Sequence, residues 1–175
     1  MKGEVDWEKV NYHLAGIVDP VKRDMLFTSL DPTGTGNVRL GAFLKWVSTT
    51  KGLEAFQRKP FLLHNSFNYA KNLSPSAGSA ENETIQRSEF GPFLMHLRTN
   101  LAFAQFFHQI DEDQNAKITK EEFIKVWPSI SNLVTTPITD PLLAFEKLDQ
   151  DENNAITLGE FLTWAWKNKM TVKYV

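Results

Sequence analysis

A stretch of twelve residues near the C-terminus constrains the fold of this chain more than any other. From Asp149 to Glu160, oxygen-bearing side chains stand at positions 1, 3, 5, 9 and 12, an isoleucine stands at position 8, and Phe161 follows directly. The same frame occurs 38 residues earlier, from Asp111 to Glu122, and a phenylalanine again follows it. A pattern that returns with its apolar residues in phase indicates a repeated structural unit.

The spacing of these oxygen atoms is typical of the calcium-binding loop of an EF-hand, a helix–loop–helix unit. Calcium takes about six to eight oxygen ligands, from side chains at positions 1, 3, 5 and 12 and from a backbone carbonyl at position 7. The sequence therefore predicts two calcium sites. Their ligands are Asp111, Asp113, Asn115, Lys117 and Glu122 in one loop, and Asp149, Asp151, Asn153, Ala155 and Glu160 in the other. The alternative interpretation is a pair of acidic surface turns that bind no ion.

The two predicted sites differ at position 6, where the loop requires a left-handed backbone conformation. Asn154 adopts that conformation readily, whereas Ala116 adopts it at a cost of about 1–2 kcal/mol. In both loops, threonine at position 9 and glutamate at position 12 also form the Thr-x-x-Glu pattern of a helix capping box. We therefore expect calcium to bind more tightly to the loop 149–160 than to the loop 111–122.

A third copy of the frame runs from Asp31 to Ala42 and is followed by Phe43. It keeps glycine at position 6 and valine at position 8, but alanine replaces the glutamate at position 12 and threonines stand at positions 3 and 5. The bidentate carboxylate is missing, and hydroxyl groups are weak neutral ligands. This loop is predicted to keep the EF-hand shape and to bind no calcium.

A fourth copy is the most altered. Ile85 matches position 8 and Glu89 matches position 12, which places Gly78 at position 1 and an alanine at position 3. Neither of the last two side chains can coordinate an ion. The sequence therefore predicts an elongated, non-binding turn in which the carboxylates of Glu81, Glu83 and Glu89 lie in solvent.

Apolar residues at helical spacing place helices around these loops. We expect an N-terminal helix within residues 5–18, helices at 20–30, 60–73 and 90–110, a helix that ends near Trp127–Pro128, and another that starts at Asp140–Pro141. Residues at position 8 of paired loops normally form a short antiparallel bridge, so loop one should pair with loop two, and loop three with loop four. The helix 90–110 is apolar over most of its circumference, which indicates burial, and Pro92 is expected in its first turn.

The predicted fold class is therefore all-α, with four EF-hand helix–loop–helix units in two packed lobes and an extra N-terminal helix. The N-terminal lobe, residues 1–95, contains the two degenerate hands. The C-terminal lobe, residues 96–175, contains the two calcium-binding hands. No linker separates the lobes, so we expect them to pack against each other.

Composition excludes several classes of function. A net charge of −2 without a cluster of basic residues argues against a nucleic-acid partner. Without cysteine, the chain forms neither disulfides nor thiolate metal sites. No long apolar run and no signal peptide are found, so we expect a soluble, intracellular, cytoplasmic protein. The four histidines lack metal-ligand spacing and no nucleophile stands with a base and an orienting group, so we expect no enzyme.

The order of these features resembles that of the calflagins, the flagellar calcium-binding proteins of protists, over nearly the whole chain. The residues that carry the resemblance are Trp7, Lys125–Pro128, Asp140–Asp149 and Phe161–Ala165. The resemblance implies a calcium sensor in a flagellar or cytoskeletal setting. Calflagins are held at the membrane by N-terminal acylation. Here residue 2 is lysine, Gly3 comes one place too late for myristoylation, and no cysteine can be palmitoylated, so no acylation signal is expected.

Three functions are consistent with this reasoning. The first is a calcium sensor that exposes apolar surface to a protein partner, with Trp127, Trp164 and Trp166 on or near the helices that move. The second is a constitutive structural component of an axoneme or cytoskeletal complex, in which calcium only stabilises the fold. The third is a calcium buffer, which binds tightly and barely opens. Calcium-dependent exposure of apolar surface distinguishes the first from the other two.

Overall fold

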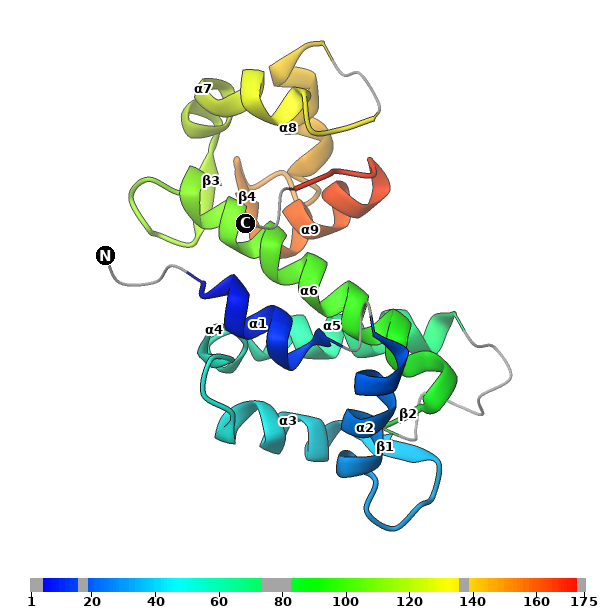
Figure 1. The fold of residues 1–175 in the computed structure, drawn as a ribbon. Coiled ribbons are helices and arrows are strands. Elements are labelled where there is room, and N and C mark those ends of the chain that lie inside the picture. The colour runs from blue at the N-terminus through cyan, green and yellow to red at the C-terminus, as the bar shows by residue number, and fades with distance from the viewer. Residues whose placement is uncertain (1–4, 16–18, 74–82, 136–138, 173–175) are drawn as a thin grey trace. The chain divides into compact units, whose positions relative to one another are not determined.

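The computed structural model describes residues 5–15, 19–73, 83–135 and 139–172, and within them the chain is mostly helical (Figure 1). The helices are α1 (Trp7–His13), α2 (Pro20–Leu30), α3 (Leu40–Thr49), α4 (Glu54–Gln57), α5 (Pro60–Asn72), α6 (Arg87–Ile110), α7 (Lys120–Ser131), α8 (Pro141–Leu148) and α9 (Leu158–Lys167). The strands are β1 (Asn37–Arg39), β2 (Thr84–Gln86), β3 (Lys117–Thr119) and β4 (Ala155–Thr157). The predicted all-α fold is confirmed, since the strands form only two short two-stranded sheets among the described residues.

The four strands lie in the loops between successive helices and join these loops in pairs. Val38 of β1 lies opposite Ile85 of β2, and Ile118 of β3 lies opposite Ile156 of β4, in antiparallel register. All four side chains are buried. The predicted pairing is therefore confirmed, and the chain has the helix–loop–helix arrangement of four EF-hands in two pairs.

Two helices begin at the Asp-Pro pairs that the sequence indicated. The Asp19 carboxylate accepts the backbone N–H of Val21 at 2.9 Å, and Asp140 accepts that of Leu142 at 2.8 Å. The proline in each first turn has no N–H that would need a partner. Local sequence therefore determines the starts of α2 and α8.

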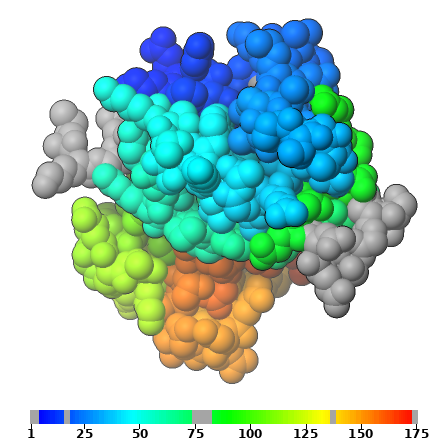
Figure 2. All heavy atoms as spheres, turned by 90° about the horizontal axis from the view of Figure 1, so that it is seen from below, coloured from blue at the N-terminus to red at the C-terminus, as the bar shows by residue number. Residues whose placement is uncertain are grey.

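The chain divides into two compact units, Met1–Leu101 and Ala102–Val175, and the division falls within α6. In the first unit, Phe27 packs edge-on against Phe90 at 5.2 Å between ring centroids, and Phe43 packs against Phe93 at 4.8 Å. Figure 2 shows the surface above this core, where the blue-to-cyan segments of α2, β1 and α3 lie next to the green start of α6. The core of this unit thus joins the helices of the two degenerate hands.

The second unit has an aromatic core of its own. Phe107 from α6 contacts Phe161 from α9 at 5.7 Å between ring centroids, and Phe123 from α7 contacts Phe145 from α8 at 5.8 Å. All four rings are buried. The phenylalanines that follow or precede the loops therefore hold the helices of hands three and four around one core.

Two prolines lie deeper inside helices than predicted. Helix α6 begins at Arg87, so Pro92 is its sixth residue and not in its first turn. Helix α7 runs through Pro128 to Ser131, although the sequence predicted its end there. Ile130 is fully buried and Asn132 Nδ2 donates to the Pro128 carbonyl at 2.7 Å, so packing and capping outweigh the cost of an interior proline.

The remaining differences concern the N-terminal half. The first helix is shorter than its apolar pattern, since α1 ends at His13, while residues 16–18 lie outside the described part. The four-residue helix α4 was not predicted. Among the described residues, no helix is both long and apolar enough to cross a membrane.

Candidate metal centres

Three carboxylates converge in each of the two acidic loops. Oxygen atoms of Asp111, Asp113 and Glu122 lie within 4.8 Å of one another, and the same holds for Asp149, Asp151 and Glu160. These residues occupy positions 1, 3 and 12 of each loop. The structure therefore brings together, twice, the charged side chains that the sequence predicted as ligands.

The backbone of each loop is shaped by two residues in the left-handed region. At position 6, φ is +67° at Ala116 and +64° at Asn154, as the sequence predicted. At position 4, φ is also positive, +58° at Gln114 and +56° at Glu152, and this was not predicted from the sequence. The sequence does carry an indication of the positive φ at position 4, because the loop 31–42 has Gly34 there, and Gly34 also has a positive φ.

This turn wraps the chain around the carboxylate at position 1. Asp111 Oδ1 accepts the N–H of Asn115 at 3.1 Å and its Oδ2 accepts that of Ala116 at 3.0 Å. Asp149 accepts the corresponding N–H groups of Asn153 and Asn154 at 3.0 and 2.9 Å. Both aspartates are buried. Their side chains therefore hold the turn in place from within.

The glutamate at position 12 closes the loop onto its outgoing helix. Glu122 Oε2 accepts the N–H and the hydroxyl of Thr119, each at 2.8 Å, and its Oε1 accepts the N–H of Glu112 at 3.1 Å. Glu160 makes the same three contacts, with Thr157 and Gln150. Both predicted capping boxes are present. The hydrogen bond from the N–H at position 2 was not predicted from the sequence.

These hydrogen bonds keep both glutamates ionised. Burial by itself raises the pKa of Glu122, but the N–H and hydroxyl of Thr119 and the N–H of Glu112 stabilise the charged form and hold the pKa below its usual value. The pKa of Glu160 is lowered in the same way, burial being outweighed by the hydrogen bonds from Thr157 and Gln150. Both groups are therefore anionic near neutral pH, as cation binding requires.

The two loops differ at positions 3 and 5. Asn115 Nδ2 donates to Asp113 Oδ2 at 2.7 Å, and Asn115 Oδ1 accepts the N–H of Lys117 at 2.8 Å. In both loops the aspartate at position 3 also accepts the N–H of the asparagine at position 5, at 3.1 Å for Asp113 and 3.2 Å for Asp151. Lys117 and Ala155, at position 7, are the first residues of β3 and β4. In the loop 111–122 an ion must therefore compete with a side-chain hydrogen bond for one oxygen of Asp113.

The donor set fits a hard divalent cation. Each centre offers three carboxylates and an asparagine, and no nitrogen or sulfur ligand accompanies the carboxylates in the groups that the described residues form. Oxygen-only sets suit calcium and magnesium, whereas zinc and copper favour histidine or cysteine. The loop 111–122 contains five carboxylates and two lysines, while the loop 149–160 contains four carboxylates and no basic residue.

The first loop has the same turn but lacks the carboxylates at positions 3 and 12. Gly34 and Gly36, at positions 4 and 6, have positive φ, and the Asp31 carboxylate accepts the N–H groups of Thr35 and Gly36 at 3.0 and 2.7 Å. The hydroxyl of Thr35 also donates to Asp31, at 2.9 Å. Burial of Asp31 opposes ionisation, but these hydrogen bonds lower its pKa below the usual value. Hydrogen-bond donors of the loop itself therefore stabilise the charged Asp31 carboxylate.

The second loop requires a correction. The sequence placed the Glu89 carboxylate in solvent, but Glu89 is only 1% exposed. Lys71 Nζ lies 3.4 and 3.5 Å from its two carboxylate oxygens, and the Gln86 N–H donates to it at 2.8 Å. Glu81, like Gly78 at position 1, lies outside the described residues. The core of the unit therefore encloses Glu89 together with a lysine from another helix, which no local pattern could indicate.

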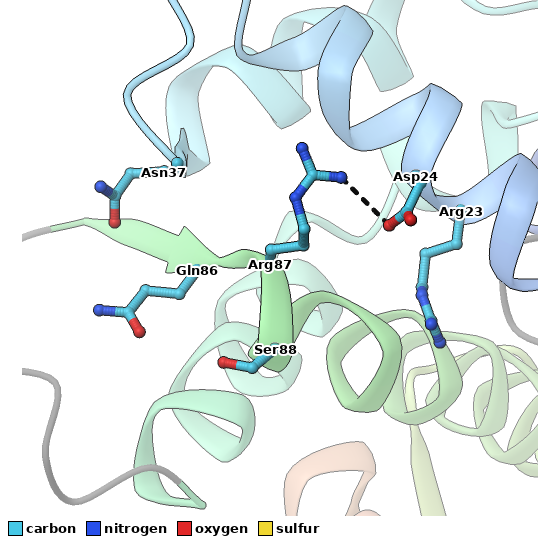
Figure 3. A pocket seen from close by; sticks show the side chains of 7 residues that line it. Arg23, Asp24, Asn37, Gln86, Arg87 and Ser88 are labelled. Carbon is cyan, nitrogen blue, oxygen red and sulfur yellow. Dashed lines mark hydrogen bonds and ion pairs between the residues drawn. The ribbon is translucent and has the colours of Figure 1, made fainter.

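An open hollow of about 710 Å³ lies beside the start of α6 (Figure 3). Its walls are polar, and its lining residues are Arg23, Asp24, Gly36, Asn37, Gln86, Arg87 and Ser88. In Figure 3 the guanidinium of Arg87 turns toward Asp24, to which it is joined at 3.1 Å, and it also lies over the Phe27 ring at 4.5 Å from the centroid. Arg87 thus connects α6 to α2.

Comparisons with known proteins give only distant similarities. No protein-family model matches the sequence, and no curated protein matches it. Among solved structures, a homolog of programmed cell death 6 protein from Leishmania major Friedlin is 16% identical, with 91% of this chain and 92% of that chain covered and a TM-score of 0.38. Calcium-loaded apo-aequorin from Aequorea victoria is 17% identical, with 93% of each chain covered and a TM-score of 0.35. Similarities at this level establish neither a family nor an activity.

Proposed function

We propose that this chain is a calcium-binding EF-hand protein with two ion sites, in the loops 111–122 and 149–160. The observation that carries the proposal is the convergence of three carboxyl groups at positions 1, 3 and 12 of two paired loops. The ten residues predicted from the sequence are the proposed ligands, with Lys117 and Ala155 acting through their carbonyl oxygens. Residues 1–95 form the proposed non-binding lobe and residues 96–175 the binding lobe.

The site at 149–160 is proposed to be the tighter one. Asn154 tolerates its positive φ better than Ala116 does, and Asp151 is not engaged by the asparagine side chain that occupies Asp113. The absence of lysine from the loop 149–160 also makes its potential more favourable to a cation. These three differences favour the same site.

The proposed role is that of a sensor that exposes apolar surface to a protein partner. Trp127 of α7 and Trp164 of α9 are buried, with ring centroids 6.4 Å apart, on the two outgoing helices. The Trp164 indole N–H has no hydrogen-bond partner among the described residues. A buried donor without a partner costs about 1–3 kcal/mol, so movement of α9 that gives this N–H an acceptor is favoured.

The setting of the protein is proposed from the sequence alone. The resemblance to calflagins supports a flagellar or cytoskeletal location and a protein partner there. The chain has no cluster of basic residues, so a nucleic-acid partner is not proposed. The resemblance extends to the calcium-binding loops and their flanking helices.

A constitutive structural role is the second candidate. The observation that favours it is that the carboxylates of the degenerate hands already have protein partners. The N–H groups of Thr35 and Gly36 donate to Asp31, and Lys71 forms an ion pair with Glu89. The two degenerate hands are therefore proposed to keep their conformation without calcium. In this role, calcium stabilises the second unit without uncovering its core.

A calcium titration of the whole chain tests the proposal. In the presence of physiological magnesium, calorimetry should detect two sites with dissociation constants of about 10⁻⁷ to 10⁻⁵ M. Glu160→Gln should remove the stronger phase and Glu122→Gln the weaker one, and the double variant is the matched control. Absence of calcium binding at micromolar concentrations overturns the proposal, and survival of the stronger phase in Glu160→Gln reverses the ranking.

An apolar dye separates the two roles. A sensor should gain dye fluorescence with calcium in the wild type and not in the double variant. Calcium binding without any gain of fluorescence supports the structural role.

A further inference from the structure

The glutamate at position 12 is held in the same way in three of the four hands. Glu122 and Glu160 each accept the N–H of the residue three places earlier at 2.8 Å, through Oε2. Glu89 accepts the N–H of Gln86, also three places earlier, at 2.8 Å and through Oε2. The second hand has therefore kept the position-12 glutamate in its EF-hand geometry, although its loop has lost the other ligands.

What differs is the charge that faces this carboxylate. Lys71, near the end of α5, places its Nζ 3.4 Å from Glu89 Oε2 and 3.5 Å from Oε1, so that one ammonium faces both oxygens. The side chain of Glu89 is fully buried and that of Lys71 is only 10% exposed. A carboxylate this deeply buried requires a compensating positive charge, because its desolvation is otherwise too costly.

We propose that the Lys71 ammonium is a built-in cation that replaces calcium in the second hand. It binds the two oxygens that a calcium ion would take from the glutamate at position 12, and it comes from the incoming helix of the same hand. The pair therefore joins α5 to α6 permanently, as an ion would join them only when bound. The N-terminal unit is thereby set in one arrangement whatever the calcium concentration.

Neighbouring contacts support this role. Glu89 lies between Arg87, which reaches Asp24 of α2 at 3.1 Å, and Phe90, which packs against Phe27 of α2. The start of α6 is thus tied to both incoming helices of the unit. The Arg87–Asp24 pair is half exposed and contributes little by itself, so the buried Lys71–Glu89 pair is the principal ionic connection.

Hydrogen exchange of the whole chain, followed by peptide in a calcium chelator, tests this inference independently of the calcium sites. Lys71→Met keeps the buried stem and leaves Glu89 without its counter-charge. Exchange in the peptides covering α5 and residues 84–95 should become about a hundredfold faster, while peptides covering α7 to α9 should not change. The matched control is Lys45→Met, which alters an exposed lysine of α3 in the same unit and should have little effect.

The double variant Lys71→Met/Glu89→Gln distinguishes a missing charge from missing packing. Removal of both charges should restore at least tenfold of the protection lost in Lys71→Met, and Lys71→Arg should retain protection within about tenfold of the wild type. The inference is overturned if Lys71→Met behaves like Lys45→Met, or if the double variant exchanges as fast as Lys71→Met. Neither result bears on calcium binding by the second unit.

Discussion

Ala116 adopts a backbone conformation that alanine takes at a cost, at the same loop position where the other acidic loop has asparagine and the first loop has glycine. The cost of a left-handed conformation for a residue with a Cβ is about 1–2 kcal/mol. Because Gln114 and Glu152 have similar φ values, position 4 adds no difference between the two acidic loops. A single residue therefore accounts for much of the expected difference in affinity.

Replacing Ala116 by glycine should strengthen the weaker site. Glycine adopts positive φ without strain, so calcium affinity of the loop 111–122 should rise by up to about tenfold. Calorimetry in the Glu160→Gln background isolates that site. Asn154→Gly, measured in the Glu122→Gln background, is the matched control and should change affinity only slightly. An equal gain at both sites would show that strain at position 6 does not determine the difference.

His96 is a buried histidine whose pKa is lowered by its surroundings. It is 3% exposed, stacks on Tyr69 at 3.9 Å between ring centroids, and contacts Ser66 and Asn100 at 3.1 and 3.0 Å through Nδ1. Burial lowers its pKa from 6.5 to about 4. The four histidines lack metal-ligand spacing in the sequence, and His96 lies in the core.

This pKa predicts a pH dependence of stability. Between about pH 6.5 and pH 4 the unfolded chain binds a proton at His96 and the folded chain does not, so the free energy of unfolding should fall as the pH decreases through this range. Urea unfolding at pH 7 and pH 5 in a chelator should show a smaller decrease for His96→Gln than for the wild type. His64→Gln, at an exposed position, should keep the wild-type decrease. Equal decreases in all three proteins contradict the assignment.

At the scale of the element, the loop 31–42 has the backbone conformation of an EF-hand loop although it lacks most of the calcium ligands. It has positive φ at positions 4 and 6, an aspartate that accepts the N–H groups at positions 5 and 6, and a strand paired in register. It therefore reproduces the turn of the acidic loops without the carboxylates at positions 3 and 12. The glycines and the hydrogen bonds to the aspartate at position 1 are sufficient for the shape, and the carboxylates at positions 3 and 12 are not needed for it.

Restoring the ligands should consequently create a third site. The variant Thr33→Asp/Thr35→Asn/Ala42→Glu places carboxylates at positions 3 and 12 and an amide at position 5 of an existing turn. Calorimetry should detect one additional calcium ion per chain. The same variant with glutamine at residue 42 lacks the bidentate carboxylate and should show no third ion. No additional binding in the first variant would indicate that the loop shape alone does not support a site.

Helix boundaries show which elements the sequence could predict. The starts of α2 and α8 were predicted from Asp-Pro pairs, because capping is a local interaction between adjacent residues. The end of α7 was not, because burial of Ile130 and the Asn132 contact extend the helix beyond Pro128. Local rules therefore located the starts of α2 and α8, while tertiary contacts decided where α7 ends.

At the scale of the whole molecule, the proposed ions act on one unit. Residues 91–175 contain eight basic and eleven acidic groups, so two calcium ions change the net charge of this part from −3 to +1. In the first unit, the Asp31 carboxylate accepts hydrogen bonds from Thr35 and Gly36, and Lys71 of α5 faces the Glu89 carboxylate. The expected packing of the two lobes against each other stays a prediction.

Calcium should therefore protect the two units unequally. Hydrogen exchange with and without calcium should show slower exchange in peptides from residues 111–168, because ion binding stabilises only the folded loops. Peptides from α2 to α5 should change much less. The Glu122→Gln/Glu160→Gln variant should lose the effect of calcium altogether. Equal protection of both units would contradict a calcium-independent first unit.

The sequence by itself determined the features that depend on residues close together in the chain. The positions of the six converging carboxylates and the missing glutamate at residue 42 follow from fixed spacing within twelve residues. The pairing of the loops follows from the repeat itself, because Val38, Ile85, Ile118 and Ile156 each stand at position 8 of their own loop. Only the tertiary structure decided the state of Glu89. Its partner Lys71 stands 18 residues earlier on another helix, and burial in a shared core, which no local pattern encodes, turns a surface carboxylate into an internal ion pair.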